Sequence, residues 1–327
     1  MIPADDLILE TDGFAPLVEP ILLVALAGLF DAAGVATAAL DLVADPNPDG
    51  VDGSVIVGEI DPDRFYDFTM ERPTVEVVDE DSVICWPSNA FRTVRTGLGH
   101  DLVVLSGVEP HLRWRAFIAC IMDAATRLGI VKVVTLGSTA DVIPHTRMPV
   151  VVGSTSNPAL AGEFALAAPT YQGVTGLVGA LHAVLEEAAV PSISLRVGVP
   201  HYLVMGEHPR AVSSLLLHAA HVVGVPIGVD LREAIDRWDE VHTASIAEDD
   251  NLRRYVEVLE VEYDRRAEAA VTPADDLAAS FEDFLRASGE PGSTDSTDDA
   301  GDAPGGPEGP GEPDVGLGRL GGGGSPP

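Results

Sequence analysis

Lysine is almost absent from this chain, because Lys132 is the only one among 327 residues. A phosphate-binding loop of the Gly-Lys-Ser/Thr type needs a lysine directly before a hydroxyl residue, whereas Lys132 lies between two valines. A Schiff-base enzyme would have to use the same side chain, at the start of a predicted strand. The sequence therefore argues against a P-loop nucleotide site and against lysine-dependent covalent catalysis.

Positive charge is scarce overall. The chain has 19 Lys and Arg residues against 52 Asp and Glu residues, and its formal net charge is −33. Nucleic acids and anionic membrane surfaces are bound through basic patches. We therefore expect neither nucleic acid nor membrane as a partner.

Cysteines and long hydrophobic runs are also few. Cys85 and Cys120 both lie within apolar runs, which indicates small buried side chains in a reducing compartment. The run Ile21–Leu29 is too short to span a bilayer, and no basic segment followed by an apolar one opens the chain. These features predict a soluble, cytoplasmic protein.

Motifs of common enzymes and metal sites are missing as well. There is no Gly-x-Ser-x-Gly elbow, no His-Glu-x-x-His and no paired cysteine motif. Gly28, Asp31 and Gly34 have the wrong spacing for a dinucleotide fingerprint, and Asp31 would repel a pyrophosphate. His218 and His221 are three residues apart on a predicted helix, but no acid accompanies them. We expect no metal and no cofactor.

Short β-branched runs alternate with helical patterns, which is typical of an α/β fold with buried strands. A hairpin within this series, Thr74–Val78 with Ser82–Trp86, favours a mixed sheet. The other predicted strands are Ile21–Ala27, Val55–Ile60, Leu102–Val108, Val131–Leu136, Val150–Val152 and Ile193–Val199. The predicted helices include one reaching about Val43, Trp114–Leu128, one starting at Asn157-Pro158, Gly176–Ala189 and Pro209–Val223.

The pattern changes near Asp230 and again near Ser288. Residues 231–270 are helical and heavily charged with a narrow apolar stripe, and Thr272-Pro273-Ala274-Asp275 opens one more helix. From Ser288 the chain is rich in Gly, Pro and acids and cannot bury enough surface to offset its ordering entropy. We predict an α/β domain over 1–230, a helical extension over 231–287 and a disordered acidic tail over 288–327.

Polar residues follow the predicted strands where each one ends. Because parallel strands end at one edge of a sheet, we expect these residues to surround one cleft. The acidic and histidine members are Asp31, Glu109, His111, Asp141, His145 and His201. Of these, Glu109, Asp141, His145 and His201 are catalytic candidates as general acids and bases, while the alternative role is to tie loops to backbone amides. For Glu109 we favour the structural role, because Glu-Pro at a strand end suits a tight turn.

Glycines and an aromatic–arginine cluster complete the candidate residues. Glycines in or near the strand-end loops would let a backbone approach a ligand, or would permit tight packing between elements. Those assigned to the cleft are Gly28, Gly34, Gly107, Gly137, Gly173 and Gly176. Arg113, Trp114 and Arg115 are interface candidates, since Trp and Arg dominate binding hot spots, or else Trp114 packs a helix start on the sheet.

Several of these motifs, in this order, resemble the PAC2 family, which is related to proteasome assembly chaperone 2. The resemblance runs from about Pro20 to Arg265 and is closest to actinobacterial members. It rests on Tyr66-Asp67-Phe68-Thr69 with Arg72-Pro73, Trp86-Pro87-Ser88, Gly107–Phe117, Val134–Gly137 with Asp141–Arg147, Tyr171–Gly179 and Val199–Tyr202. Two features depart from the family: the first turn lacks a tryptophan, and the ending Gly324-Ser325-Pro326-Pro327 lacks the hydrophobic-Tyr-x motif of proteasome-docking relatives.

The resemblance implies a three-layer α/β/α domain like the phosphorylase/hydrolase fold, with a C-terminal helical extension. It also implies homo-oligomers, with the trimer as the expected state. The function that it favours is a non-enzymatic assembly chaperone or scaffold, with proteasome subunits as partners. The alternative from the residues themselves is a phosphorylase- or hydrolase-like enzyme that acts on a small molecule at the strand-end cleft.

Overall fold

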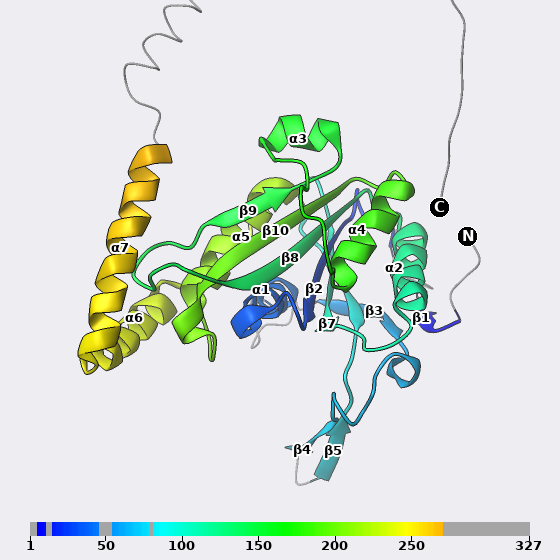
Figure 1. The fold of residues 1–327 in the computed structure, drawn as a ribbon. Coiled ribbons are helices and arrows are strands. Elements are labelled where there is room, and N and C mark those ends of the chain that lie inside the picture. The colour runs from blue at the N-terminus through cyan, green and yellow to red at the C-terminus, as the bar shows by residue number, and fades with distance from the viewer. Residues whose placement is uncertain (1–4, 11–14, 46–53, 79–80, 271–327) are drawn as a thin grey trace, which may run out of the picture. The chain divides into compact units, whose positions relative to one another are not determined.

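The computed structural model describes residues 5–10, 15–45, 54–78 and 81–270. Residues 1–270 form one compact unit, and within its described part eight strands make one sheet (Figure 1). The sheet order is β1-β3-β6-β7-β2-β8-β10-β9. The bounds of these strands are β1 Leu7–Leu9, β2 Ile21–Ala27, β3 Val55–Ile60, β6 Ala90–Val94, β7 Leu102–Val108, β8 Lys132–Asp141, β9 Val151–Ser154 and β10 Ser192–Pro200.

The sheet is mixed, which confirms the expectation from the sequence. Strands β7, β2, β8 and β10 are parallel neighbours, and β2 lies between β7 and β8 with Ile21 opposite both Leu102 and Lys132. Strands β1, β3, β6 and β9 join antiparallel at the two sides. The carboxyl ends of the four parallel strands therefore meet at one edge of the sheet.

Helices cover both faces of the sheet, so the predicted three-layer α/β/α architecture is confirmed. Helices α1 (Val35–Ala44) and α5 (Pro209–Val223) pack on one face, and α2 (Trp114–Leu128) and α4 (Leu177–Glu187) pack on the other. Strand β2 sends alternate side chains to the two layers: Leu23 lies in the α1/α5 core and Leu22 in the α2/α4 core. This double burial explains why its sequence is apolar throughout.

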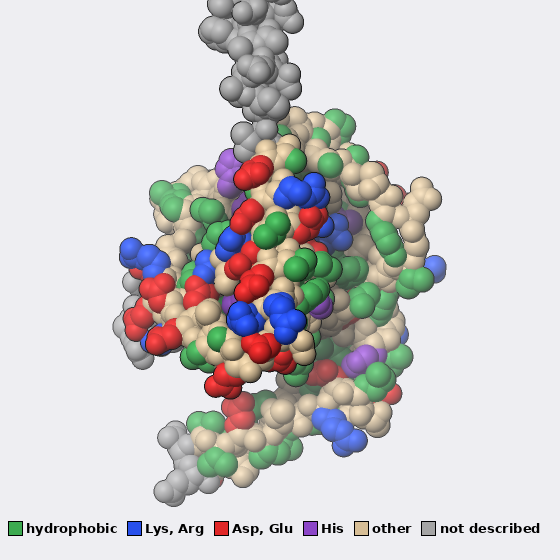
Figure 2. Space-filling model, turned by 60° about the vertical axis from the view of Figure 1, so that its left-hand side comes forward, with side chains coloured by type: hydrophobic (Ala, Val, Ile, Leu, Met, Phe, Trp, Pro, Cys, Tyr) green, Lys and Arg blue, Asp and Glu red, His purple; other side chains and the backbone are tan. Residues whose placement is uncertain are grey.

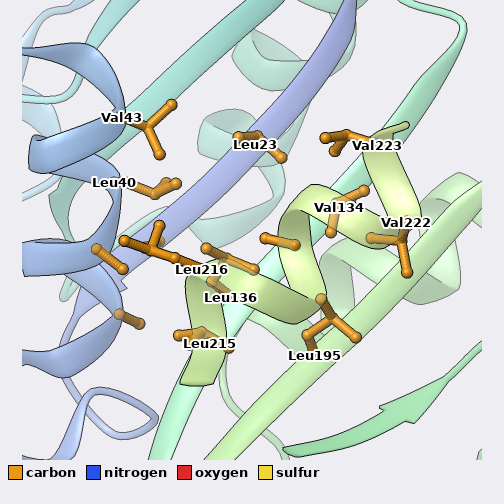
Figure 3. Packing of buried hydrophobic residues seen from close by; sticks show 14 of the residues in the cluster. Leu23, Leu40, Val43, Val134, Leu136, Leu195, Leu215, Leu216, Val222 and Val223 are labelled. Atoms are coloured by element: carbon orange, nitrogen blue, oxygen red, sulfur yellow. The ribbon is translucent and has the colours of Figure 1, made fainter. Parts of the chain in front are cut away.

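The first of these cores fills the space between the sheet and the helix pair α1 and α5. Figure 3 shows Leu23, Val134, Leu136 and Leu195 of the sheet facing Leu40 and Val43 of α1 and Leu215, Leu216, Val222 and Val223 of α5. Leu23, Leu40 and Leu215 are fully buried. At about 25 cal/mol per Å² of apolar surface removed from water, such burial is the main term that stabilises the fold.

The opposite face of β8 and β10 is polar rather than apolar. The residues of β10 that alternate with the buried Ile193, Leu195 and Val197 are Ser192, Ser194 and Arg196. On β8, the corresponding residues are Thr135 and Gly137. A fully buried parallel strand is usually apolar on both faces, so this polar surface sets β8 and β10 apart from β2.

The predicted hairpin is present as β4 (Thr74–Val78) and β5 (Asp81–Cys85), with Thr74 opposite Cys85. It forms a separate two-stranded sheet, and in Figure 1 it projects away from the main sheet below β3 and β7. All five residues of β4 are exposed. The hairpin therefore adds little to the core of the molecule.

The helices predicted after Asp230 are α6 (Arg232–Ala247) and α7 (Asp250–Ala270). Figure 2 shows the outer face of this region, where acidic and basic side chains are interspersed. The predicted start of helix α3 (Pro158–Phe164) is confirmed, since the Asn157 side chain accepts hydrogen bonds from the Ala159 and Leu160 amides. The helix expected after Thr272 and the acidic tail over 288–327 lie outside the described residues.

Three short 3-10 turns complete the described elements: η1 Ala32–Gly34, η2 Pro62–Arg64 and η3 His201–Leu203. Two strands, β1 and β6, were not predicted, and β8 continues to Asp141 instead of ending at Leu136. Within the part of the chain that the structure describes, no helix is both long and apolar enough to cross a membrane.

Candidate functional site

The residues predicted at strand ends lie along the carboxyl edge of the parallel strands. Asp31 follows β2, Glu109 and His111 follow β7, Asp141 ends β8 with His145 in the next loop, and His201 follows β10. Their side chains take part in separate local networks. A cavity of about 490 Å³ on one face of the sheet is lined by none of these six residues.

Glu109 is held by backbone amides, as expected for a structural role. Its Oε2 accepts a hydrogen bond from the Leu29 amide at 3.2 Å, and its Oε1 accepts one from the Leu177 amide at 2.7 Å. Leu177 is the first residue of α4, where a carboxylate is favoured by the helix dipole. A side chain at Gly28 or Gly176 would place its Cβ 2.7 Å or 3.0 Å from a Glu109 carboxylate oxygen. Both glycines thus make room for this acid.

Asp31 is also satisfied by local donors. Its Oδ1 accepts from the Ala36 amide at 2.7 Å and from the Ser138 hydroxyl at 3.3 Å, and its Oδ2 accepts from the Thr37 hydroxyl at 2.6 Å. The residue is buried, and Gly34 beside it has a φ of 64°, which favours glycine. Asp31 thus fixes the start of α1 against β8, and three donors from these two elements bind its carboxylate.

Asp141 and His201 interact with each other through the backbone. The Nδ1 atom of His201 lies 3.1 Å from the Asp141 carbonyl oxygen, and its Nε2 lies 3.3 Å from the Tyr255 hydroxyl of α7. The Asp141 carboxylate accepts from the Val142 amide at 2.7 Å. His111, farther along the edge, accepts at Nδ1 from the Asp67 amide at 3.4 Å. None of these contacts forms an acid–base pair between side chains.

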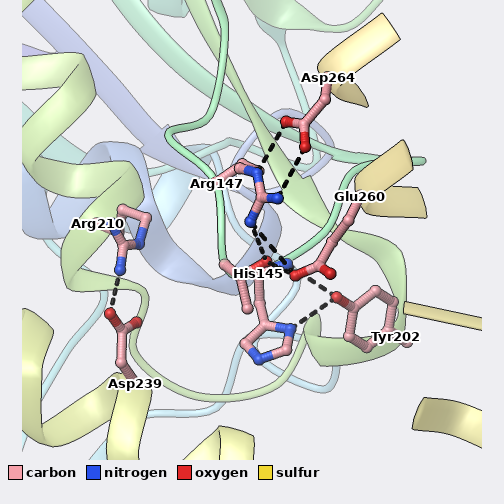
Figure 4. Close-up of polar contacts among 8 residues, drawn as sticks. His145, Arg147, Tyr202, Arg210, Asp239, Glu260 and Asp264 are labelled. Atoms are coloured by element: carbon pink, nitrogen blue, oxygen red, sulfur yellow. Dashed lines mark hydrogen bonds and ion pairs between the residues drawn. The ribbon is translucent and has the colours of Figure 1, made fainter. Parts of the chain in front are cut away.

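His145 packs against the rings of Tyr202 and Trp238 in an aromatic cluster, and Figure 4 shows its polar contact with Tyr202. The Tyr202 hydroxyl accepts from the His145 amide at 2.8 Å and lies 2.9 Å from the ring Nδ1. Burial lowers the pKa of His145, and burial raises the pKa of Tyr202 to about 12. The ring of Trp238 from α6 packs edge-on against His145 and stacks on His242. The cluster therefore joins the β8–β9 loop to α6.

Ion pairs beside this cluster attach α7 to the same loop. Arg147 forms two hydrogen bonds with the Asp264 carboxylate, at 2.9 Å and 2.8 Å, and contacts Glu260 at 3.3 Å. The Tyr263 hydroxyl donates to the Met148 carbonyl at 2.6 Å. A further ion pair, between Arg210 of α5 and one carboxylate oxygen of Asp239, joins α5 to α6 (Figure 4). His145 thus belongs to a structural joint between the α/β domain and its helical extension.

The predicted interface cluster divides into packed and exposed members. The indole N–H of Trp114 donates to the Pro110 carbonyl at 2.7 Å, and its ring packs against the α2/α4 core. Arg113 lies over the Phe65 ring at 5.7 Å and pairs with Asp6 at 3.6 Å. Arg115 is exposed.

Gly107 is needed for packing, because a Cβ there would meet the Asn89 side chain at 2.1 Å.

A cavity of about 490 Å³ lies on the polar face of β8 and β10. Of the predicted residues it contains Gly137 and Gly173. A Cβ at Gly137 would lie 3.1 Å from the Phe30 carbonyl oxygen and 3.4 Å from Cγ of Arg196. The lining also includes Phe30, Thr135, Ser154, Thr155, Ser156, Pro169, Tyr171, Thr175, Val178, Gly179, His182, Ala183, Glu186, Ser194 and Arg196.

His182 of α4 is the lining residue with the most perturbed ionisation. Burial lowers its pKa to about 4, and the nearby Arg196 charge acts in the same direction. Its Nε2 lies 2.8 Å from the Thr135 hydroxyl and its Nδ1 lies 3.2 Å from the Ser192 hydroxyl. The ring is therefore neutral near pH 7. Sequence reasoning missed His182, although its place on the inner side of a predicted helix, opposite strands with alternating hydroxyl residues, was a usable signal.

No group of three or more His, Cys, Asp or Glu side chains suited to a metal occurs among the described residues. His218 and His221, on α5, have separate contacts: His218 with the Ser214 carbonyl oxygen at 2.8 Å and His221 with the Phe164 ring.

The class of fold is a three-layer α/β/α domain with a mixed sheet. A projecting hairpin and two C-terminal helices are added to this domain. The model of the PAC2 family matches residues 25–244, and the chain belongs to this family. Comparison with curated protein sequences gives no significant match.

Solved structures agree with this assignment. A PAC2 family protein from Streptomyces avermitilis is 32% identical, with a TM-score of 0.66, and the match covers 72% of this chain and 99% of that one. A protein from Mycobacterium tuberculosis described as a proteasome-assembly chaperone homologue is 31% identical, with a TM-score of 0.63, over 72% of this chain and 99% of its own. An archaeal proteasome activator from Pyrococcus furiosus shares the fold at 14% identity, with a TM-score of 0.54 over 74% of this chain and 97% of that one.

Proposed function

We propose that this chain is a non-enzymatic assembly chaperone or scaffold that works as a homo-oligomer and has proteasome subunits as partners. The similarity to the Mycobacterium tuberculosis protein, described as a proteasome-assembly chaperone homologue, supports the class of partner. The observation that carries the proposal is the apolar surface of the β4–β5 hairpin. A chaperone of this kind needs a surface that binds another protein, and the hairpin offers one.

The hairpin exposes side chains that are normally buried. Val75 and Val77, which share one face of β4, are 67% and 73% exposed, and Ile84 of β5, opposite Val75, is 55% exposed. Figure 2 shows hydrophobic side chains on the arm that projects at the bottom of the view. A two-stranded sheet is marginal by itself in water, and exposed apolar strands tend to pair with other protein surfaces. The hairpin is therefore suited to bind a second protein.

Two carboxylates at the strand ends, the catalytic candidate Glu109 and the predicted cleft residue Asp31, favour the same conclusion. A general base needs a lone pair within reach of a substrate proton. Glu109 is bound by two backbone amides, and Asp31 is bound by an amide and two hydroxyls. Both side chains fix elements of the scaffold. The strand-end residues thus support a structural role better than the enzyme alternative.

The test changes the polarity of the hairpin without changing its shape. Val75→Thr with Val77→Thr keeps β-branching on β4 and adds a hydroxyl to each side chain. The control is Leu217→Ser on α5, where a leucine 67% exposed lies far from the hairpin in the chain. Both variants should keep the thermal unfolding transition of the parent chain.

Two measurements decide the proposal. Native gels follow the assembly of proteasome particles from the host's purified subunits, and sedimentation gives the oligomeric state. The parent and Leu217→Ser should accelerate assembly, and the hairpin variant should lose most of that effect. A parent chain that neither binds the subunits nor changes their assembly would refute the chaperone role, and a stable monomer at micromolar concentration would refute the oligomer.

A further inference from the structure

The cavity on the polar face of β8 and β10 is lined by no residue of the β4–β5 hairpin, on which the proposed assembly role rests. Its volume of about 490 Å³ is within the range of sites for small molecules. We propose that it binds a small organic anion, with the acidic group at Arg196 and an aromatic or other apolar body against Phe30 and Tyr171. Three features of the cavity favour such a ligand: its charge, its free hydroxyls and the arrangement of its two ends.

Arg196 supplies the positive charge. The chain carries a formal charge of −33, yet in the described ranges no carboxylate lies within ion-pair distance of the Arg196 guanidinium. The stem of Arg196 packs beside Gly137, with its Cγ 3.4 Å from the position that a Cβ on Gly137 would occupy. A guanidinium with free donors is suited to a carboxylate, a sulfonate or a phosphate, because its N–H groups match their oxygens in pairs.

Serine hydroxyls lie beside this charge. Ser194 precedes Arg196 by two residues on β10, so both side chains lie on the same face, and Ser194 is directly opposite Ser154 of β9. Within the part of the chain that is described, neither hydroxyl has a hydrogen-bond partner. They are thus available to donate to an anion bound at Arg196.

The rest of the cavity suits an apolar body. Phe30 and Val178 contribute to its lining, and Tyr171 extends over it from the loop before α4, with its hydroxyl donating to the Val174 carbonyl at 2.8 Å. Thr175 packs against Gly179, and Arg196 packs against Gly137, so the glycines let these polar side chains lie close to the backbone. The apolar side chains offer a surface for the body of a ligand, within the volume of about 490 Å³.

The two ends of the cavity differ in charge, which fixes the orientation of the ligand. Glu186 lines the same helix face as Gly179, seven residues later on α4, and the helical rise places them about 10 Å apart along the axis. His182, between them, is neutral near pH 7 because its pKa is about 4. The acidic group of a ligand is therefore favoured at Arg196 and disfavoured at Glu186.

Two dyes of similar shape test the proposal on the full chain. Anilinonaphthalene sulfonate carries an anionic group on an aromatic body, whereas N-phenyl-naphthylamine has the body without the charge. Arg196→Gln removes the cation, and Ala183→Trp fills the cavity from an exposed position of α4, so neither change affects the core. The controls are Arg115→Gln, an exposed arginine outside the cavity, and the Val75→Thr with Val77→Thr hairpin variant.

The parent should bind the sulfonate dye saturably, measured by fluorescence titration. Arg196→Gln should weaken this binding at least tenfold and change binding of the neutral dye less than twofold. Ala183→Trp should weaken both dyes, and the two controls should match the parent. The proposal is overturned if the parent shows no saturable binding, or if Arg196→Gln binds the sulfonate dye like the parent. It is also overturned if the hairpin variant is the only one that loses binding of the sulfonate dye.

Discussion

The carboxylate of Glu109 and the backbone N–H of Leu177 form a hydrogen bond of 2.7 Å that joins the end of β7 to the first turn of α4. The second oxygen of the same carboxylate accepts from Leu29, in the turn after β2. One side chain thus fixes three elements at the carboxyl edge of the sheet. In many α/β proteins this edge holds a ligand, and here Glu109 uses both carboxylate oxygens for contacts within the chain.

Replacement of Glu109 should destabilise the protein. Glu109→Ala leaves the amide of Leu177, a fully buried residue, without its acceptor, and an unsatisfied buried partner costs about 1–3 kcal/mol. The amide of Leu29, an exposed residue, can bind water instead. The measurement is the free energy of unfolding in urea. Glu187→Ala, an exposed glutamate on α4, should differ from the parent by less than about 0.5 kcal/mol. Equal stability of Glu109→Ala and the parent would return Glu109 to the catalytic candidates.

Trp114 and its neighbour Arg115 should respond differently to replacement. Trp114→Ala removes a ring packed on the α2/α4 core and a hydrogen bond to Pro110, so we expect a loss of about 2 kcal/mol or more in the free energy of unfolding. Arg115→Ala removes an exposed side chain and should leave stability unchanged.

Trp114→Ala and Arg115→Ala also test the predicted interface. If Arg115 belongs to an oligomer contact, Arg115→Ala shifts the sedimentation profile towards smaller species without a change in thermal unfolding. An unchanged oligomer would remove Arg115 from the interface, and an unchanged stability of Trp114→Ala would show that the ring has no core role.

The central layers of the fold could be predicted from the sequence because their signals are local. The bounds of α2 and α5 match the prediction, since the apolar stripe and the following Gly129 or Gly224 mark each helix. Strands β1 and β6 carry weaker signals: Leu7–Leu9 is only three residues long, and the apolar alternation of β6 is interrupted by Arg92 and preceded by Pro87. Their pairing is decided by the neighbouring strand rather than by their own residues.

The candidate sites likewise include features that could be predicted from the sequence and features that could not. Four of the predicted residues lie at one edge of the sheet: Asp31, Glu109, Asp141 and His201. Their common edge could be predicted because parallel strands all end on the same side of a sheet. The cavity depends on a loop, Pro169 to Thr175, that returns across β8 and β10 before α4. No local pattern states where such a loop lies, so Arg196 could not be assigned to a site from the sequence. For His182 the sequence offered only its position on a helix facing hydroxyl-bearing strands.

The attachment of α7 should depend on Arg147. Arg147→Ala removes the paired hydrogen bonds to Asp264 and the contact with Glu260. Both partners are partly exposed, so the expected change in global stability is below about 1 kcal/mol. Local opening of α7 should become more frequent, seen as faster hydrogen exchange of its amides. Arg265→Ala, whose partner Glu262 lies on the same helix, is the control and should leave exchange in the rest of α7 unchanged.

Stability should fall as the pH decreases below the ordinary histidine pKa. Burial lowers the pKa of His145, His182 and His208, and that of His182 to about 4. The unfolded chain then binds these protons at a higher pH than the folded chain, so stability is complete above about pH 6.5 and is lost as the pH falls towards 4. His182 alone accounts for up to about 3 kcal/mol of this loss.

A pair of variants isolates the share of His182. His182→Gln has no ring to protonate, so its free energy of unfolding should decrease less steeply than that of the parent between pH 6.5 and 4.5. His218→Gln, at an exposed position of α5, should follow the parent over the same interval. Urea unfolding at a series of pH values measures both slopes. Parallel curves for His182→Gln and the parent would mean that the folded chain protonates His182 as easily as the unfolded chain does. The ring beside Arg196 would then be charged at acidic pH, and its placement as a neutral wall of the cavity would be wrong.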